Sequence, residues 1–333
     1  MREIPVLELG AGHALGLIEA ERGRADALLG AAQAHYPGFV INFGDRVSRR
    51  WLERNGNPYL GDIHAVAEAL GIPGLYFLNV NYEWGCTGAV GAASSGKGNR
   101  LIRVLDWPFD GLGANLVAAR IAGPAGEWIN LTWPGFVGCI QGLAPGRFAA
   151  AFNQAPMRRI SPVMVLDWTL ERARVWRDGG LPPAHLMRRI FETCANYAAA
   201  KAALIDTPIA TPAIFLLSGP EPGEGCVIER LETQSFVYEQ PAAAANHWMS
   251  PGLAGRERGE ESQIRQAMMA GRQADAGEDL AWLEAPLLNE TTRLVMIAEP
   301  ATGRLTVQGF ESHGPATRIL RLDAAPGGRR LSA

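Results

Sequence analysis

The chain has 333 residues, of which 47% are hydrophobic and 20% charged, and its formal net charge at pH 7 is -3. This composition excludes general disorder, and the length allows one large domain or two of moderate size. The negative net charge argues against nucleic acid as a partner, because phosphate binding needs a basic surface. The sequence contains no run of about 20 uncharged apolar residues, so no membrane span is predicted.

The first elements that the pattern predicts are helical. Apolar residues recur at helical spacing over residues 14–36 and 47–70. Glycine and proline then break the pattern, and the apolar run 75–82 predicts a short buried strand that leads to Cys86. From there to residue 154, apolar runs separated by Gly, Pro and Asn predict antiparallel strands joined by tight turns. These runs are 85–93, 99–107, 114–122, 127–135, 137–144 and 146–154.

The second half of the chain is also predicted to alternate between helical and strand regions. Residues 164–206 predict helix, and a closing hairpin is expected over 293–298 and 305–308. Between them we expect strands at 213–217, 225–230, 235–239 and 243–248, and helices at 260–272 and 277–284. Helices, then strands, then helices, then strands suit an α+β layered fold better than regular βαβ repetition.

The cysteine and histidine patterns exclude several kinds of site. Cys139, Cys194 and Cys226 lie among apolar or small residues, and we expect them to be inert core thiols. The chain start shows no basic segment followed by a continuous apolar run, so no secretory signal is predicted and a cytoplasmic protein without disulfides is expected. The six histidines form no metal motif, so neither a metal nor another cofactor is expected.

Cys86 directly follows Gly85, and this junction suggests self-cleavage. A thiol reaches the preceding carbonyl through a five-membered ring, and an N-to-S acyl shift followed by hydrolysis would cut the chain there. Glycine leaves that carbonyl open and tolerates unusual backbone angles. The freed α-amine, with an ordinary pKa of about 7.7–8, would serve as general base for its own thiol. The cut would separate a helical leader, residues 1–85, from a catalytic domain, residues 86–333.

Arg103 and Asp106 are the expected companions of the thiol. The guanidinium would lower the thiol pKa and orient a substrate, and the carboxylate would hold the α-ammonium. We expect both to face one pocket, with Trp107-Pro108 fixing a bend after the strand. A cysteine after glycine, or an Arg-x-x-Asp unit, is usually structural when it occurs alone. The two in succession favour a catalytic role.

The same region resembles the acid ceramidase and N-acylethanolamine acid amidase family. The matching residues are Asn79, Tyr82, Glu83, Cys86, Thr87, Arg103, Leu105, Asp106, Trp107 and Pro108. The resemblance covers roughly residues 50–310. It implies the four-layer αββα sandwich of N-terminal nucleophile hydrolases, shared with choloylglycine hydrolases. The length of the segment before Cys86 favours the ceramidase-like branch, in which the leader stays bound as the smaller subunit of an α/β heterodimer.

The resemblance also implies residue roles. Cys86 would be nucleophile and base, Arg103 and Asp106 would position it, and Asn153 and Asn246 would supply the oxyanion site. Trp107, Gln154 and Arg265 would contact substrate. Without the resemblance, Asn246 is equally well a turn residue, and Arg265 a solvated ion-pair member of a charged helix. The chain departs from the family at Val104, where an Asn is usual, and at Gln154, where many relatives carry an acidic residue.

The favoured hypothesis is therefore a self-processing amidohydrolase. It would cut a linear N-acyl amide, such as an N-acylethanolamine, a ceramide-like lipid or an N-acyl amine, into an acid and an amine. Two alternatives stay open: an acyltransferase of the same fold, and an unprocessed relative that binds lipids or amides without catalysis. An apolar face on the leader helices is compatible with contact with a membrane or micelle, although such faces usually pack on the core. A homo-oligomer also stays open.

Overall fold

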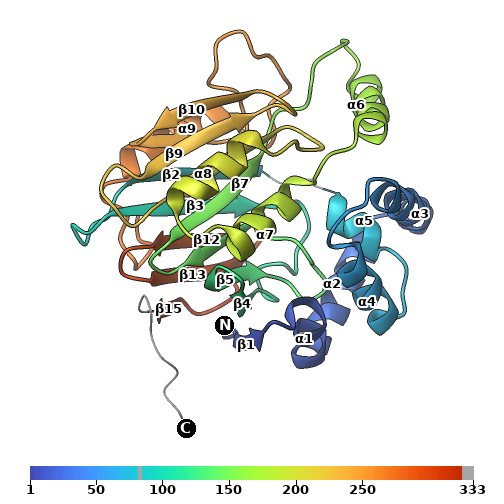
Figure 1. Ribbon diagram of the computed structural model, residues 1–333, viewed down its shortest axis with the longest axis horizontal. Coiled ribbons are helices and arrows are strands. Elements are labelled where there is room, and N and C mark those ends of the chain that lie inside the picture. The colour runs from blue at the N-terminus through green and yellow to red at the C-terminus, as the bar shows by residue number, and fades with distance from the viewer. Residues whose placement is uncertain (82–84, 325–333) are drawn as a thin grey trace.

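The computed structural model describes residues 1–81 and 85–324, and its centre is a pair of β-sheets packed face to face (Figure 1). One sheet has eight strands in the order β1 (Val6–Gly10), β4 (Val117–Gly123), β5 (Gly126–Thr132), β6 (Gln141–Ala144), β7 (Phe148–Gln154), β8 (Ala213–Ser218), β9 (Gly225–Arg230) and β10 (Ser235–Glu239). The other has the order β11 (Ala242–Ala244), β2 (Gly85–Ala92), β3 (Asn99–Asp106), β12 (Thr292–Glu299), β13 (Arg304–Glu311) and β14 (Gly314–Pro315), with β15 (Leu320–Asp323) also paired to β13.

Helices cover the outer face of each sheet. Helices α7 (Pro183–Thr193) and α8 (Tyr197–Asp206) pack on the eight-stranded sheet, and α9 (Ser262–Arg272) packs on the other sheet against β2 and β11 (Figure 1). The expected αββα order of layers is confirmed.

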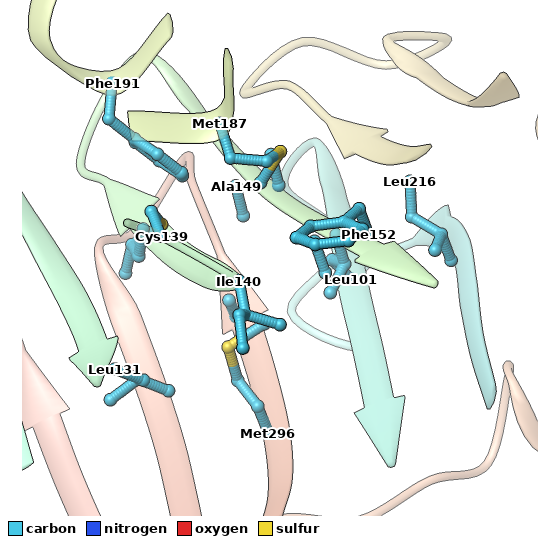
Figure 2. Packing of buried hydrophobic residues seen from close by; sticks show 14 of the residues in the cluster. Leu101, Leu131, Cys139, Ile140, Ala149, Phe152, Met187, Phe191, Leu216 and Met296 are labelled. Carbon is cyan, nitrogen blue, oxygen red and sulfur yellow. The ribbon is translucent and has the colours of Figure 1, made fainter. Parts of the chain in front are cut away.

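Burial of the strands on both faces explains why their sequences are continuous apolar runs. A strand covered on both faces needs apolar side chains on both, so alternation is lost. Every residue of β3 and of β8 is buried. In Figure 2, Met187 and Phe191 of α7 lie above Ile140, Met296 of the second sheet lies below it, and Leu101 of that sheet lies beside it near Phe152. Cys139, Cys194 and Cys226 are all buried, as expected.

The leader lies at one end of the sandwich and is not wholly helical. Its helices are α1 (His13–Ala20), α2 (Arg22–His35), α3 (Gly38–Arg54), α4 (Leu60–Leu70) and α5 (Leu75–Val80). Its strand β1 pairs in parallel with β4, which the sequence analysis missed. The helix expected over 47–70 is two helices. Within the described residues, no helix is long and apolar enough to cross a bilayer.

Polar contacts join the leader to α7. Asn57 Nδ2 lies 2.9 Å from Nδ1 of the buried His185, and the Tyr59 hydroxyl donates to Glu192 at 2.9 Å. Arg188 forms an ion pair with Asp62 at 2.7 Å. Together with the apolar cluster of the leader, these contacts bind residues 1–81 to the sandwich.

Three sequence-based predictions are wrong. The run at 75–80 is helix α5, because Asp45 Oδ1 accepts the N–H groups of Tyr76 and Phe77 at its first turn and so satisfies donors that a helix start leaves open. Residues 277–284 form turns, with Leu280 at φ 60°. Strand β11 ends at Ala244, and the chain then leaves the sheet toward Cys86.

Candidate active site

Strand register places Cys86 and Arg103 on the same face. Strands β2 and β3 are antiparallel neighbours in which Cys86 pairs with Leu105, and Gly88 pairs with Arg103. Because side chains alternate along a strand, Cys86 and Arg103 both point between the two sheets. Arg103 Nη2 lies 2.9 Å from Cys86 Sγ, and both side chains are fully buried. The structure thus brings the predicted nucleophile and guanidinium together.

Asn153, on β7 of the facing sheet, binds the other terminal nitrogen of the Arg103 guanidinium. Its Oδ1 accepts from Arg103 Nη1 at 2.7 Å, and its Nδ2 donates to the carbonyls of Ala244 and Ala245, both at 3.1 Å. A carboxamide nitrogen carries two hydrogens, so none remains for an oxyanion. The expected oxyanion role is therefore corrected: Asn153 positions Arg103.

Asn246 holds the backbone of the nucleophile. The Cys86 N–H donates to Asn246 Oδ1 at 2.7 Å, and Asn246 Nδ2 donates to the Gln154 carbonyl at 2.8 Å. Arg265 Nη2 also donates to Asn246 Oδ1, at 3.3 Å. Cys86 N is the nitrogen of the predicted scissile bond and would become the α-amine after cleavage. Asn246 lies at a bend just after β11, as the turn interpretation expects, and its side chain also binds that nitrogen.

Asp106 lies on the opposite face of β3 from Arg103, which corrects the expectation that both face one pocket. Residues three apart on a strand point to opposite sides. Asp106 Oδ1 accepts from Thr292 Oγ1 at 2.9 Å, and its Oδ2 lies 3.6 Å from Arg265 Nη1. The carboxylate stands beside Gly85, its Cα partner on β2. It therefore faces the cleavage junction rather than the thiol.

Arg265 is buried behind the nucleophile, so its interpretation as a solvated helix residue is wrong. Its Nη1 donates to the Cys86 carbonyl at 3.0 Å and to Thr87 Oγ1 at 2.6 Å. It also reaches Asn246 and Asp106, as described above. One guanidinium therefore joins the nucleophile's backbone, its nitrogen ligand and the carboxylate. This arrangement makes Arg265 a positioning residue, not the substrate contact that was expected.

Burial dominates the electrostatics of the uncut site. It raises the pKa of the Cys86 thiol to about 12, against the opposing effects of Arg103, Arg265 and a backbone hydrogen bond from Gln154. Burial likewise raises the pKa of Asp106, although Arg265 and Thr292 favour the ionised carboxylate. The raised pKa favours the neutral thiol in this state, so a role as nucleophile would require a base to take the thiol proton.

Comparisons with known proteins agree with this geometry. Human acid ceramidase is 35% identical over 112 residues, which are 33% of this chain and 27% of that protein. The mouse acid ceramidase is 33% identical over 106 residues. The chain is a relative of acid ceramidase. The predicted family resemblance is thereby confirmed, although the match spans only about a quarter of those relatives' length.

Solved structures place this ceramidase relative in a known fold. The Caenorhabditis elegans ortholog of N-acylethanolamine-hydrolyzing acid amidase superposes with a TM-score of 0.51 at 18% identity, over 65% of this chain and 93% of the other. A likeness at this identity speaks for the fold alone, the predicted four-layer sandwich. No family model matches the sequence.

Two pockets of the ceramidase relative meet beside the nucleophile. One, of about 350 Å³, is lined by Gly85, Asp106, Trp107, Pro108, Gln154, Arg258, Gly259 and Thr291. The other, of about 370 Å³, runs under helix α6 (Met164–Asp178) and is mostly apolar, with Phe152, Met157 and Trp168 in its wall. Gln154 and Arg258 line both pockets. The predicted substrate contacts Trp107 and Gln154 are thus at a pocket wall.

The Tyr82-Glu83 part of the family motif falls outside the described residues. Across residues 1–81 and 85–324, no group of three or more His, Cys, Asp or Glu is placed to hold a metal ion.

Sequence reasoning missed several residues that hold the site. Thr292 on β12 fixes Asp106, and Ser262 at the start of α9 accepts the Asn246 N–H at 2.8 Å. His247 contacts Ser262 in turn. Ser and Thr hydroxyls occur throughout the sequence, so Thr292 had no signal of its own. The Ser262-x-x-Arg265 unit and the Asn246-His247-Trp248 run resemble family motifs, and this resemblance was the signal that could have pointed to Ser262 and His247.

Proposed function

We propose that this protein is a self-processing N-terminal cysteine amidohydrolase that cuts linear N-acyl amides with an apolar acyl group. The observation that carries the proposal is the pair of short contacts at Cys86. Arg103 Nη2 lies 2.9 Å from its sulfur, and Asn246 Oδ1 lies 2.7 Å from its nitrogen. A structural cysteine needs neither contact, whereas a residue that uses both thiol and amine needs both.

Self-cleavage would begin with the thiol of Cys86 adding to the Gly85 carbonyl carbon. As the S–C bond forms, the thiol loses its proton to a base, such as a water molecule at the junction. The C–N bond then breaks and the nitrogen, held by Asn246, takes up a proton. Water hydrolyses the resulting thioester, which leaves a Gly85 carboxylate and a free N-terminal Cys86.

Turnover would repeat this chemistry on a substrate. The α-amine accepts the thiol proton as sulfur attacks the amide carbonyl, and then passes it to the leaving amine. Arg103 stabilises the thiolate, since a cation beside the sulfur favours its charged form. Water releases the acyl group from the thioester as a carboxylic acid. The thiol and amine are then restored.

The two pockets support the substrate class. The pocket beneath α6, with Phe152, Met157 and Trp168 in its wall, suits an acyl chain. The pocket at Gly85 has Asp106 and Thr291 in its wall, and these polar side chains suit the amine part and entering water. They meet at Gln154 and Arg258, next to the nucleophile, where the amide bond would lie. The related worm amidase is named for hydrolysing N-acylethanolamines, which pair an acyl chain with a small polar amine.

Exposed apolar side chains on helix α6 support a contact with a membrane or micelle. Met164, Val165 and Trp168 are exposed and line the apolar pocket. Ile160, Val163 and Leu166, close to them in sequence, are also exposed, as are Phe39 and Phe43 of α3. A lipid surface would cover them and deliver an acyl chain to the pocket.

After cleavage, the contacts of Asn57, Tyr59 and Asp62 with α7 would retain the leader as the small subunit of a heterodimer.

Intact mass and N-terminal sequencing test the proposal. Purified wild-type protein should yield two chains, the second beginning at Cys86, and should hydrolyse N-acylethanolamines. Cys86→Ala should stay a single chain of about 36 kDa without activity, whereas the matched control Cys194→Ala, another buried thiol, should cleave normally. Cleavage at this junction in Cys86→Ala would refute the mechanism, and an uncut, inactive wild type would favour the non-catalytic relative. A competing amine that captured most of the acyl group would identify an acyltransferase.

A further inference from the structure

Asn246 is held in place by a chain of side-chain hydrogen bonds that extends away from the nucleophile. Its backbone N–H donates to Ser262 Oγ at 2.8 Å. Ser262 Oγ lies 2.9 Å from Nδ1 of His247, and His247 Nε2 lies 2.8 Å from Gln266 Oε1. Gln266 Nε2 donates to the carbonyl of Ala243 at 2.8 Å. This series of contacts links the end of β11 to the first turns of α9.

The partners of His247 indicate which of its ring nitrogens carries a hydrogen. The Gln266 amide nitrogen is used by Ala243, so its oxygen faces His247 and can only accept. His247 Nε2 must therefore carry a hydrogen. In the Nε2–H tautomer, Nδ1 accepts from the Ser262 hydroxyl, which keeps its lone pairs for the Asn246 N–H. Every hydrogen in the series then has an acceptor.

Helix α9 supplies all the members of this series that lie outside the 243–247 segment. Ser262, Arg265 and Gln266 are three and four residues apart, and so lie on one face of the helix. The Ser262 hydroxyl oxygen accepts the Asn246 backbone N–H, and Arg265 donates to the Asn246 side chain. The Gln266 side-chain oxygen accepts from His247. The first two fix the Asn246 oxygen that accepts the Cys86 N–H. His247 sets the direction of the Ser262 hydroxyl.

We propose that His247 is a positioning residue for the amidase reaction, acting through Ser262 on Asn246 and so on the nitrogen of Cys86. This inference rests on the proposed function, because the nitrogen that Asn246 holds is the scissile amide and later the general base. His247 itself touches neither thiol nor substrate. Its loss lets the Ser262 hydroxyl rotate and releases the Asn246 backbone. The orientation of the base then suffers, while the substrate pockets do not.

Two substitutions separate this role from simple packing. An asparagine at 247 puts its oxygen about where Nδ1 is and still accepts from Ser262. A glutamine reaches about to Nε2 and keeps only the Gln266 contact, although it is closer to histidine in size. His247→Asn should therefore retain kcat and the self-cleavage rate within about threefold, and His247→Gln and His247→Ala should each lose about tenfold, as for one lost hydrogen bond of about 1.4 kcal/mol. KM should stay within about twofold in all three.

The measurements are the time course of cleavage at Gly85-Cys86, and kcat and KM on an N-acylethanolamine, with His64→Gln as a control for a histidine outside the site. His247→Gln at or above His247→Asn in kcat would overturn the proposal, as would KM alone changing. Nitrogen NMR on uncut Cys86→Ala protein gives a second, activity-independent test. The Nε2–H tautomer is expected, and an Nδ1–H or charged ring would overturn the proposal. An uncut, inactive wild type would instead refute the proposed function, and the tautomer would then decide the role of His247.

Discussion

Arg103 on β3 reaches diagonally to β2 and places its Nη2 2.9 Å from the Cys86 sulfur, while its Nη1 binds Asn153 on the facing sheet. The guanidinium thus spans the interior between the two sheets. Its planar fork serves two acceptors in fixed directions, which a single ammonium group cannot do.

Arg103→Lys should therefore slow cleavage and turnover although it keeps the charge. We expect a loss of about 10- to 100-fold in both rates, the range that corresponds to one charge-assisted hydrogen bond of about 1.5–3 kcal/mol. Arg103→Met should lose more. Mass spectrometry against time and kcat on the mature enzyme measure the effect, and the exposed Arg49→Lys serves as control. Unchanged rates in Arg103→Lys would remove the guanidinium from the mechanism.

Asn153 should act only through Arg103. Asn153→Ala alone should lower kcat about tenfold, because Arg103 loses an anchor, yet it should add little to Arg103→Met. A double-mutant cycle on kcat measures this coupling. If Asn153 were an oxyanion donor, its loss would lower kcat by the same factor in the Arg103→Met background as in wild type.

Gly85→Ala should be tolerated in cleavage. The φ angle of Gly85 is not in the left-handed region, and a Cβ there would meet Asp106 at 3.5 Å, an ordinary contact. Gly85 therefore does not use the left-handed backbone angles that glycine tolerates. We expect a cleavage rate within about threefold of wild type, and strong slowing in Gly85→Leu, whose side chain would fill the pocket beside Asp106. A Gly85→Ala chain that stayed uncut would show that the glycine has a conformational role.

His185 should make folding sensitive to acid. Burial lowers its pKa to about 3 from an ordinary value of 6.5. Below pH 6.5 the unfolded chain binds a proton that the folded chain excludes, so stability is full above 6.5 and falls toward pH 3 by up to about 1.4 kcal/mol per pH unit. Urea midpoints between pH 8 and 4 measure the slope. His185→Gln should flatten this slope, whereas His64→Gln should not. Equal slopes in wild type and both variants would rule out His185 as a source of the pH dependence of stability.

The exposed apolar side chains of α6 should mediate lipid binding. Trp168→Ser with Val165→Ser should lower co-sedimentation with phosphatidylcholine vesicles several-fold, because both side chains are more than half exposed. Hydrolysis of a short, freely soluble N-acyl amide should change less than hydrolysis of a long-chain one. Phe236→Ser on the edge strand β10, another exposed apolar side chain, is the control. Equal vesicle binding by both variants would argue against this surface.

Local pattern predicted most elements and the reactive junction. The apolar runs at 99–107 and 213–217 became β3 and β8, since strands buried on both faces leave an unmistakable composition. The run at 75–80 was mistaken for a strand because so short a run, apolar except for Asn79, shows no clear helical or strand period. Its helical form depends on Asp45, some thirty residues away, which accepts its first N–H groups.

Sequence by itself determined the chemistry at one point: a thiol after glycine, followed by an arginine and a carboxylate on the next strand. Which groups surround that thiol was decided only by the tertiary structure. Asn153 arrives from the facing sheet, and Arg265 and Ser262 arrive from a helix at the other end of the chain. Strand alternation then sent Arg103 inward and Asp106 to the α9 side. Contacts between segments so distant in sequence leave no local pattern, because each partner fits its own element equally well without the other.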